Sequence, residues 1–392
     1  MDKFLLVLCT AFPGLQKLIL LITIAAVYNS DIVGLYSVDI GVATFFSFIT
    51  SVGYAAILLK KIPSSDHDLK IATLSSNIIN CLILSTSLIP FIFVMSKIGW
   101  VHDFLGVSVA LISIGLNQIF RHFYLAERNY LHLLILDLLA FILQIVAITL
   151  STKNSFLILS SLTTISVLFI CSKFLRLKIL FLKETVFEND AIQFALNNIV
   201  SAGIAALIPM ILLKYYTASF TGVVSTYISG LSFFMILIRS FSNYLIPALI
   251  IKIKENGMLC DSMVNQYRIR FYQIFFLAFI FALLSYFLID NVLPALNMSG
   301  EYIIDLSLYI SIVLFIFSAS ASVFSGNILF VLSKQKYNLY SNILYTLIFV
   351  SINFIFLWTG VSIDPALLIT TFALISFIRF PYLSFYVSKF VR

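Results

Sequence analysis

Three cationic residues lie deep inside apolar stretches of the sequence, where a charge needs a chemical reason. Lys17 stands near the middle of an apolar segment over residues 4–27. At about 1.5 Å per helical residue it is roughly 15 to 20 Å from the two ends, too far for its stem to reach water. Arg239 and Arg379 occupy later apolar segments. We interpret all three as candidates for binding an anionic group, such as a diphosphate, in a hydrated cavity.

Other polar residues at similar depth leave alternatives open. Asp39 and Asp137 are the carboxylates that could pair with Lys17 or Arg239 and make these cations purely structural. Arg379 stands two residues before Pro381, where the last helix could end, so an interfacial position is its alternative. Uncharged side chains at this depth could line a saccharide-binding wall or make hydrogen bonds between helices. They are Gln118, Gln144, Gln193, Asn197 and Asn198.

The elements that must hold these residues are membrane-spanning helices. Hydrophobic residues make up 61% of the chain and charged residues only 10%, with a mean hydropathy of +1.08. This leaves too little polar surface for a water-soluble protein. Pro13 and Gly14 predict a kink in the first span. Runs of about 20 apolar residues predict twelve spans, at 4–27, 33–59, 71–95, 104–125, 130–150, 155–172, 191–213, 222–250, 271–290, 303–332, 338–358 and 365–388.

The net charge of +7 is explained by topology and gives no indication of nucleic-acid binding. With the N-terminus inside, most lysines and arginines fall in cytoplasmic loops or span ends, and we assign Arg121 to such an end. Both termini are therefore expected to be cytoplasmic. The four cysteines show no disulfide framework and no metal-binding spacing. We expect no cofactor and no metal.

An internal repeat divides the chain into two halves. At an offset of 188 residues, the segment 28–40 aligns with 216–228, so Gly34-Leu-Tyr-Ser37 matches Gly222-Val-Val-Ser225. Each half contains six spans and enters the membrane in the same orientation. We predict an N-lobe at 1–172, a basic cytoplasmic linker or interfacial helix at 173–190, and a C-lobe at 191–392.

Enzyme motifs are missing from the sequence. It has no HExxH, no GxSxG and no glycine-rich phosphate loop, and its four histidines form no ligand pattern. The loops expected outside the membrane are short. We therefore predict that the protein is not an enzyme.

These features resemble a known family of transporters. Lys17 in the first span, Gly34 to Ser37 after a short outer loop, the degenerate copy at Gly222 to Ser225, twelve spans and a basic mid-chain segment are similar to the polysaccharide flippases of the MOP (multidrug/oligosaccharidyl-lipid/polysaccharide) exporter superfamily. The size and phenylalanine content are most similar to Wzx-type O-antigen and capsule flippases. Lipid II flippases of this superfamily usually carry two further C-terminal spans.

The resemblance implies an all-α, V-shaped, two-lobed bundle in the bacterial inner membrane. It implies translocation of an undecaprenyl-diphosphate-linked oligosaccharide to the outer leaflet for lipopolysaccharide or capsule biosynthesis. Lys17, Arg239 and Arg379 would then bind the diphosphate. Partners are the lipid bilayer and, as further candidates, the polymerase and chain-length proteins of the pathway. One alternative is a cation-coupled multidrug or metabolite antiporter that uses Asp39 or Asp137. Another is a polymerase- or ligase-type membrane enzyme.

Overall fold

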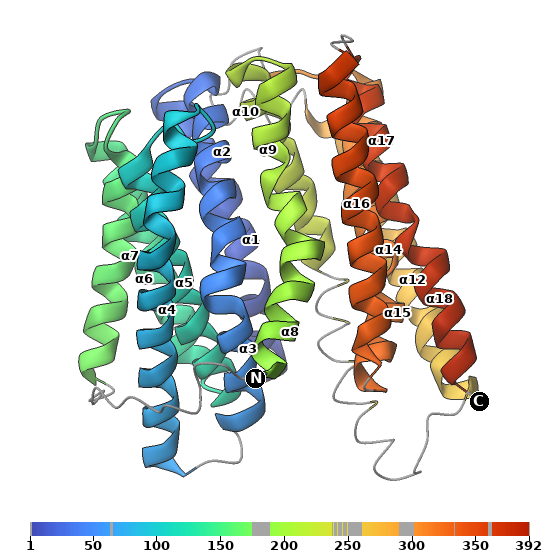
Figure 1. Ribbon diagram of the computed structural model, residues 1–392, viewed down its shortest axis with the longest axis horizontal. Coiled ribbons are helices and arrows are strands. Elements are labelled where there is room, and N and C mark those ends of the chain that lie inside the picture. Colours follow the sequence, from blue (N-terminus) through green and yellow to red (C-terminus); the bar gives the residue numbers. More distant parts are fainter. Residues whose placement is uncertain are drawn as a thin grey trace. The chain divides into compact units, whose positions relative to one another are not determined.

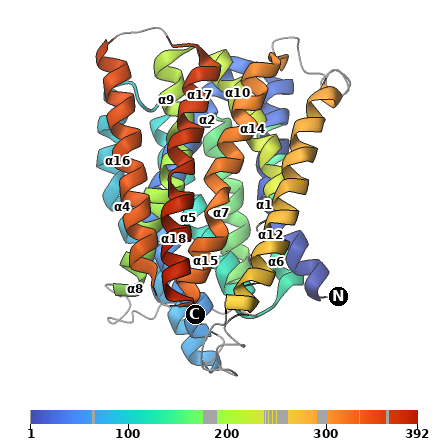
Figure 2. The same cartoon turned by 90° about the vertical axis from the view of Figure 1, so that its right-hand side faces the viewer.

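The structure is a computed structural model in which all regular elements of the described residues are helices (Figure 1). It describes residues 2–62, 66–174, 189–236, 261–289, 302–332, 334–359 and 363–391, together with residues 238, 241, 245 and 249. The chain divides into two compact units, Met1–Ser225 and Thr226–Arg392. Within each unit the helices run side by side along a common direction (Figures 1 and 2).

The N-terminal unit is a bundle around two apolar cores. Its helices are α1 (Asp2–Val27), α2 (Ser30–Ser47), α3 (Gly53–Lys61), α4 (His67–Lys97), α5 (Phe104–Ala126), α6 (Tyr130–Leu150), α7 (Phe156–Phe174), α8 (Asn189–Asn198), α9 (Ile204–Tyr215) and α10 (Ala218–Leu231), the last of which continues into the second unit. Short turns make α5, α6 and α7 sequential neighbours that pack on one another, and α1 lies against α6. The α1 helix passes through Pro13 without ending.

Two spans of this unit contain a wide π-helical turn. Phe48–Val52 joins α2 to α3, and Ile199–Gly203 joins α8 to α9. A π turn inserts one extra residue into the hydrogen-bonding pattern and shifts the side chains that follow. The two turns lie against each other, while α2 packs along α9 and α3 along α8. The spans therefore remain continuous while their side chains change register at this level.

The C-terminal unit contains α12 (Asp261–Leu284), α14 (Leu306–Ala321), α15 (Val323–Val331), α16 (Gln335–Thr359), α17 (Pro365–Phe377) and α18 (Arg379–Phe390). Asp364 accepts a hydrogen bond from the Leu367 amide and Pro365 fills the first helical position, which explains where α17 begins. α14 packs along α17. The Tyr309 hydroxyl donates to the Ala282 carbonyl at 2.6 Å and ties α14 to α12.

The predicted all-α membrane fold is confirmed. Nine of the described helical stretches are long and apolar enough to cross a membrane, and two shorter apolar helices, Phe156–Cys171 and Ile204–Tyr215, add to them. All fall on predicted spans. The linker predicted at 173–190 lies almost entirely outside the described residues, and the lobe boundaries stay a prediction.

The internal repeat is visible in matching details of local structure. The Asn29 side chain accepts a hydrogen bond from the Ile32 amide at 3.0 Å, and Thr217 accepts one from the Phe220 amide at 3.2 Å. Thus α2 and α10 begin with equivalent caps, 188 residues apart. A further pair at this offset lies where the two helices cross.

Gly34 and Gly222 form that crossing. A Cβ atom on Gly34 would lie 1.9 Å from the Ala218 carbonyl oxygen, and one on Gly222 would lie 2.2 Å from the Ser30 carbonyl oxygen. Ser30 and Ala218 are themselves a pair of the repeat, so the contact is symmetric. Only glycine allows the two backbones to approach this closely.

Candidate functional site

Lys17 lies near the middle of α1, as predicted. It stands ten residues before Val27 and twelve after Leu5, the ends of the apolar span, or roughly 15 to 18 Å from each. Its side chain is exposed on the surface of the unit, and it makes a polar or ring contact of its own. Lys17 therefore places a cation at membrane depth on an accessible face of α1.

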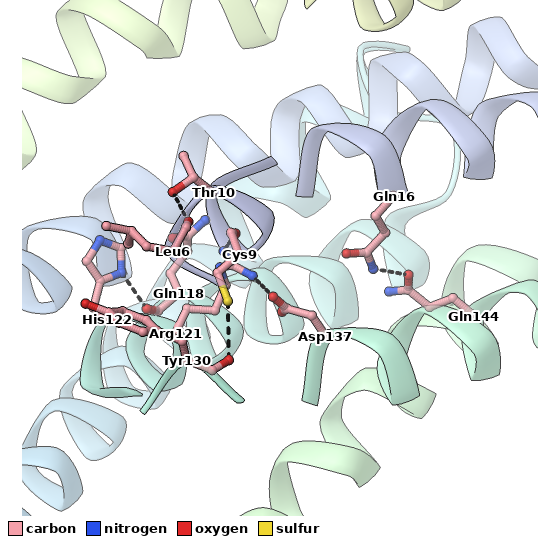
Figure 3. Close-up of polar contacts among 10 residues, drawn as sticks. All are labelled: Leu6, Cys9, Thr10, Gln16, Gln118, Arg121, His122, Tyr130, Asp137 and Gln144. Carbon is pink, nitrogen blue, oxygen red and sulfur yellow. Dashed lines mark hydrogen bonds and ion pairs between the residues drawn. The ribbon is translucent and has the colours of Figure 1, made fainter. Parts of the chain in front are cut away.

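The residue beside it belongs to a hydrogen-bonded chain across three helices. Gln16 of α1 donates to Gln144 of α6 at 2.7 Å (Figure 3). Gln144 in turn donates to the Thr164 hydroxyl of α7 at 2.7 Å. Hydrogen bonds between helices, one of the two uses we predict for Gln144, are confirmed. This chain fixes the rotation of α1, and therefore the face on which Lys17 lies.

A buried ion pair lies towards the start of the same helix. Arg121 of α5 pairs with Asp137 of α6, whose side chain is 1% exposed. A second guanidinium nitrogen of Arg121 donates to the Cys9 carbonyl of α1 at 2.8 Å, and the Cys9 thiol donates to the Tyr130 carbonyl at 3.3 Å (Figure 3). The pair joins three helices and neutralises both charges within the unit.

The assignment of Arg121 to a cytoplasmic span end stays a prediction, and the structure adds that the side chain is paired inside the unit. The residue stands five positions before α5 ends at Ala126 and is buried, because Asp137 supplies its counter-ion. The sequence contains a signal for this pair. Arg121 and Asp137 are both eight residues from Asn129 in the turn between α5 and α6, so the two antiparallel helices bring them to the same level.

Asp39 anchors a loop. Its two carboxylate oxygens accept hydrogen bonds from the backbone amides of His102 and Asp103, each at 2.9 Å, and His102 Nδ1 lies 3.6 Å away. Asp103 in turn caps α5 through the Gly106 amide at 2.8 Å. Partial burial, reinforced by the negative charge of Asp39, raises the pKa of Asp103, while the hydrogen bond from Gly106 opposes this. Asp39 therefore holds the start of α5 against α2.

Arg379 is a described cation that lies inside an apolar span of the C-terminal unit. It begins α18 directly after a break at Ile378, inside the apolar span Pro365–Phe390. Its guanidinium carbon lies 5.7 Å from the centre of the Tyr345 ring. The helix continues beyond the break to Phe390, so Arg379 is not at the end of the last helix.

The structure describes the remaining predicted site residues only in part. Arg239 lies outside the described residues. Gln193 falls within α8, while Asn197 and Asn198 end that helix, are half-buried, and both have interaction partners. The structure thus brings Gln144 next to Gln16, and Asp137 to Arg121. The roles of Lys17, Asp39, Gln193, Asn197 and Asn198 in substrate binding stay predictions.

No protein-family model and no curated protein matches this chain. Among solved structures, the chain is similar to a ligand complex of the MATE multidrug transporter DinF-BH, with 12% sequence identity and a TM-score of 0.68 over 99% of this chain and 94% of the other. It is also similar to two structures of a multidrug resistance MATE family transporter of the MOP superfamily. The outward-facing and inward-facing conformations both give 12% identity and a TM-score of 0.61, covering 99% and 100% of this chain and 95% of the others. The chain therefore has the fold of the MATE transporters of the MOP superfamily.

Proposed function

We propose that this protein is an inner-membrane transporter that moves an undecaprenyl-diphosphate-linked oligosaccharide, an O-antigen or capsule repeat unit, to the outer leaflet by alternating access. Lys17 binds the diphosphate, together with Arg239, which lies outside the described residues. The polyprenyl tail stays in lipid. No covalent bond changes, because the barrier to be lowered is the desolvation of the charged diphosphate and the sugar hydroxyls.

The observation that carries the proposal is the combination of depth and exposure at Lys17. A lysine at the centre of a span costs about 2.5 to 3.5 kcal/mol even on the mildest scale. When an anionic headgroup binds Lys17 during transport, the attraction between the two charges offsets both the cost of the lysine and the cost of desolvating the headgroup. The Gln16 to Thr164 hydrogen-bond chain keeps α1 in the rotation that exposes the lysine.

A cation-coupled multidrug antiporter is the alternative function, because the similar solved structures are named as multidrug transporters. It requires a carboxylate that exchanges a proton or metal ion during transport. Asp137 is engaged by Arg121, and both oxygens of Asp39 accept amide hydrogen bonds. Neither arrangement favours the antiporter over the flippase.

The direct test reconstitutes the protein in vesicles with a fluorescent undecaprenyl-diphosphate-linked saccharide and measures how fast the headgroup changes leaflet. We expect Lys17→Ala to slow flipping at least tenfold and Lys17→Arg to retain most of the activity. The matched control is Lys97→Ala, an exposed lysine at the end of α4, which should flip normally. Flipping unchanged in Lys17→Ala would contradict the proposal. Transport of a fluorescent organic cation that depends on Asp39 or Asp137 would support the antiporter.

Alternating access has a separate test at the crossing of α2 and α10. The Ser30 and Ser219 hydroxyl oxygens are 2.6 Å apart, close enough for a disulfide in a Ser30→Cys/Ser219→Cys variant with the native cysteines replaced. Oxidation should stop flipping and a reductant should restore it, while each single cysteine variant should be insensitive. Full activity in the cross-linked protein would show that this crossing does not open during transport.

A further inference from the structure

Arg379 lies at membrane depth in a helix that is interrupted at this residue. It stands fourteen residues from Pro365 and eleven from Phe390, roughly 16 to 21 Å from either end of the span. Pro381 lacks an amide hydrogen, so the Phe377 carbonyl cannot make its normal helical hydrogen bond. The interruption at Ile378 therefore has a cause in the sequence, and it turns the Arg379 side chain towards α16.

The guanidinium has no anionic partner in the part of the chain that the structure describes. The ion pairs there involve Lys70, His102 and Arg121, all in the other unit. Nε of Arg379 is buried and makes no hydrogen bond with any described residue. The ring of Tyr345 faces the guanidinium at 5.7 Å, but a ring quadrupole does not neutralise a full charge.

A buried serine lies one helical turn before this cation in the chain. Ser376 is 1% exposed, and its hydroxyl lies near the Tyr345 side chain. On α16, Ser341 is one turn before Tyr345, is 2% exposed, and has no hydrogen-bond partner among the described residues. Unsatisfied buried hydroxyls are costly and rare in native proteins. Arg379, Tyr345 and Ser376 thus lie together between α16 and the junction of α17 and α18.

We propose that Arg379, Tyr345 and Ser376 form a binding site for one small monovalent anion of the halide class, with chloride as the physiological example. The choice follows from the charge balance. One guanidinium neutralises one negative charge, while a diphosphate would leave excess negative charge in a medium of low dielectric constant. Hydroxyl and guanidinium hydrogens are the donors that a halide accepts. The site does not depend on the proposed function.

The test uses the purified full-length protein in detergent, with sodium chloride exchanged for sodium gluconate at constant ionic strength. Chloride that binds only the native state raises the thermal midpoint in a saturable way. We expect this increase in the wild type and its loss in Arg379→Gln. The matched control, Lys389→Gln, removes an exposed positive charge from the same helix and should keep the full chloride response. An equal response in wild type and Arg379→Gln would overturn the site.

Two further measurements keep the test decisive if Arg379→Gln does not fold. Equilibrium binding of radioactive chloride to the wild type should saturate near one ion per chain, and no saturable binding up to about 300 mM, well above the Kd of a functional site, would overturn the proposal. Ser376→Ala should weaken that binding several-fold. A rise of the thermal midpoint with an undecaprenyl-diphosphate lipid that is lost in Arg379→Gln, together with no response to chloride, would assign Arg379 to the transported substrate and overturn the chloride site. Flipping activity is measured separately, so either proposal can fail alone.

Discussion

The two units treat an arginine at membrane depth in opposite ways. In the N-terminal unit, Arg121 has a carboxylate partner in Asp137 and a carbonyl partner in Cys9. In the C-terminal unit, Arg379 has an aromatic ring and neighbouring hydroxyls, and the described residues give it no carboxylate. In the first arrangement, the charge of the arginine is neutralised by a residue of the same unit. In the second, it is neutralised only when an anion from outside the chain binds.

The difference separates structural charges from charges available to a ligand. A buried ion pair is held by its own attraction and is hard to separate, because each partner would be left uncompensated. An arginine whose hydrogen-bond donors are unused can bind an anionic ligand that reaches it. A charge at membrane depth is therefore not sufficient to identify a ligand-binding residue. The groups that interact with the charged side chain must be known as well.

The largest expected effect follows from removing one member of the Arg121 and Asp137 pair. Asp137→Ala leaves a buried guanidinium without its counter-ion and should lower the free energy of unfolding by about 3 to 5 kcal/mol. Arg121→Met leaves a buried carboxylate and should cost a similar amount. Unfolding by SDS titration in mixed micelles measures both. The double variant Arg121→Met/Asp137→Leu should recover most of the loss.

The comparison depends on the corresponding change in the other unit. Arg379→Met in chloride-free buffer should change the free energy of unfolding by less than about 1 kcal/mol, or stabilise the protein, because an apolar side chain replaces an unneutralised charge. A loss as large as that of Asp137→Ala would mean that Arg379 is also a structural charge, and the distinction between the units would fail.

A second prediction concerns the packing that closes the N-terminal unit. Gly34→Ala puts a methyl group where only 1.9 Å separates it from the Ala218 carbonyl, so α2 and α10 must move apart, at about 1 to 3 kcal/mol. Gly222→Ala should behave in the same way. Gly14→Ala is the matched control. Its Cβ has open space, and replacing a helical glycine there should stabilise by roughly 0.5 to 1 kcal/mol.

Thermal unfolding of the three alanine variants distinguishes close packing from ordinary helix propensity. If Gly34→Ala were as stable as Gly14→Ala, the crossing would be looser than the structure indicates, and the disulfide test at Ser30 and Ser219 would lose its basis. A destabilised Gly222→Ala beside a neutral Gly34→Ala would show that the repeat is symmetric in backbone only.

Asp39 provides a third and smaller effect. Asp39→Asn keeps one acceptor oxygen but turns an amide group towards the second backbone N–H, so one hydrogen bond is lost. The cost should be about 1 to 2 kcal/mol. His102→Ala should cost less, because the imidazole lies 3.6 Å from the carboxylate and is partly exposed. If thermal unfolding showed no loss in Asp39→Asn, the carboxylate would be available for other roles, which would favour the antiporter.

The spans were predictable because one requirement, about 20 apolar residues, fixes them almost independently of the rest of the fold. The repeat was predictable because Gly34 and Gly222 must remain small at the crossing, which preserves a short motif. Lys17 was found because any charge at that depth is conspicuous. In each case a single local property carries the information.

The interactions between helices were not predictable in this way. The pairing of Arg121 with Asp137 depends on the level of two helices around a turn, and the rule that places positive charges at cytoplasmic ends does not identify their partners. The π turn at Phe48–Val52 has no compositional signature, since one inserted residue changes only the hydrogen-bonding register. The surroundings of Arg379 depend on Tyr345, which lies more than thirty residues earlier in the chain.

The smallest expected effect is a dependence on pH at the loop that Asp39 holds. Asp103→Asn keeps the cap on α5, since Asn and Asp are equivalent at this position, but removes a carboxylate whose pKa is raised by partial burial and by Asp39. A raised native pKa means that ionisation of Asp103 destabilises the folded state above that pKa, and that the penalty disappears as pH falls below the unfolded value near 3.8. Asp103→Asn should therefore be more stable than the wild type at pH 7, by less than about 1 kcal/mol, and the advantage should vanish near pH 4. Thermal midpoints of both proteins between pH 4 and 7 measure this difference. If Asp103→Asn instead gained stability relative to the wild type as the pH falls, the folded protein would stabilise the ionised form of the Asp103 carboxylate. The N-terminal unit would then neutralise this charge as completely as it does that of Arg121.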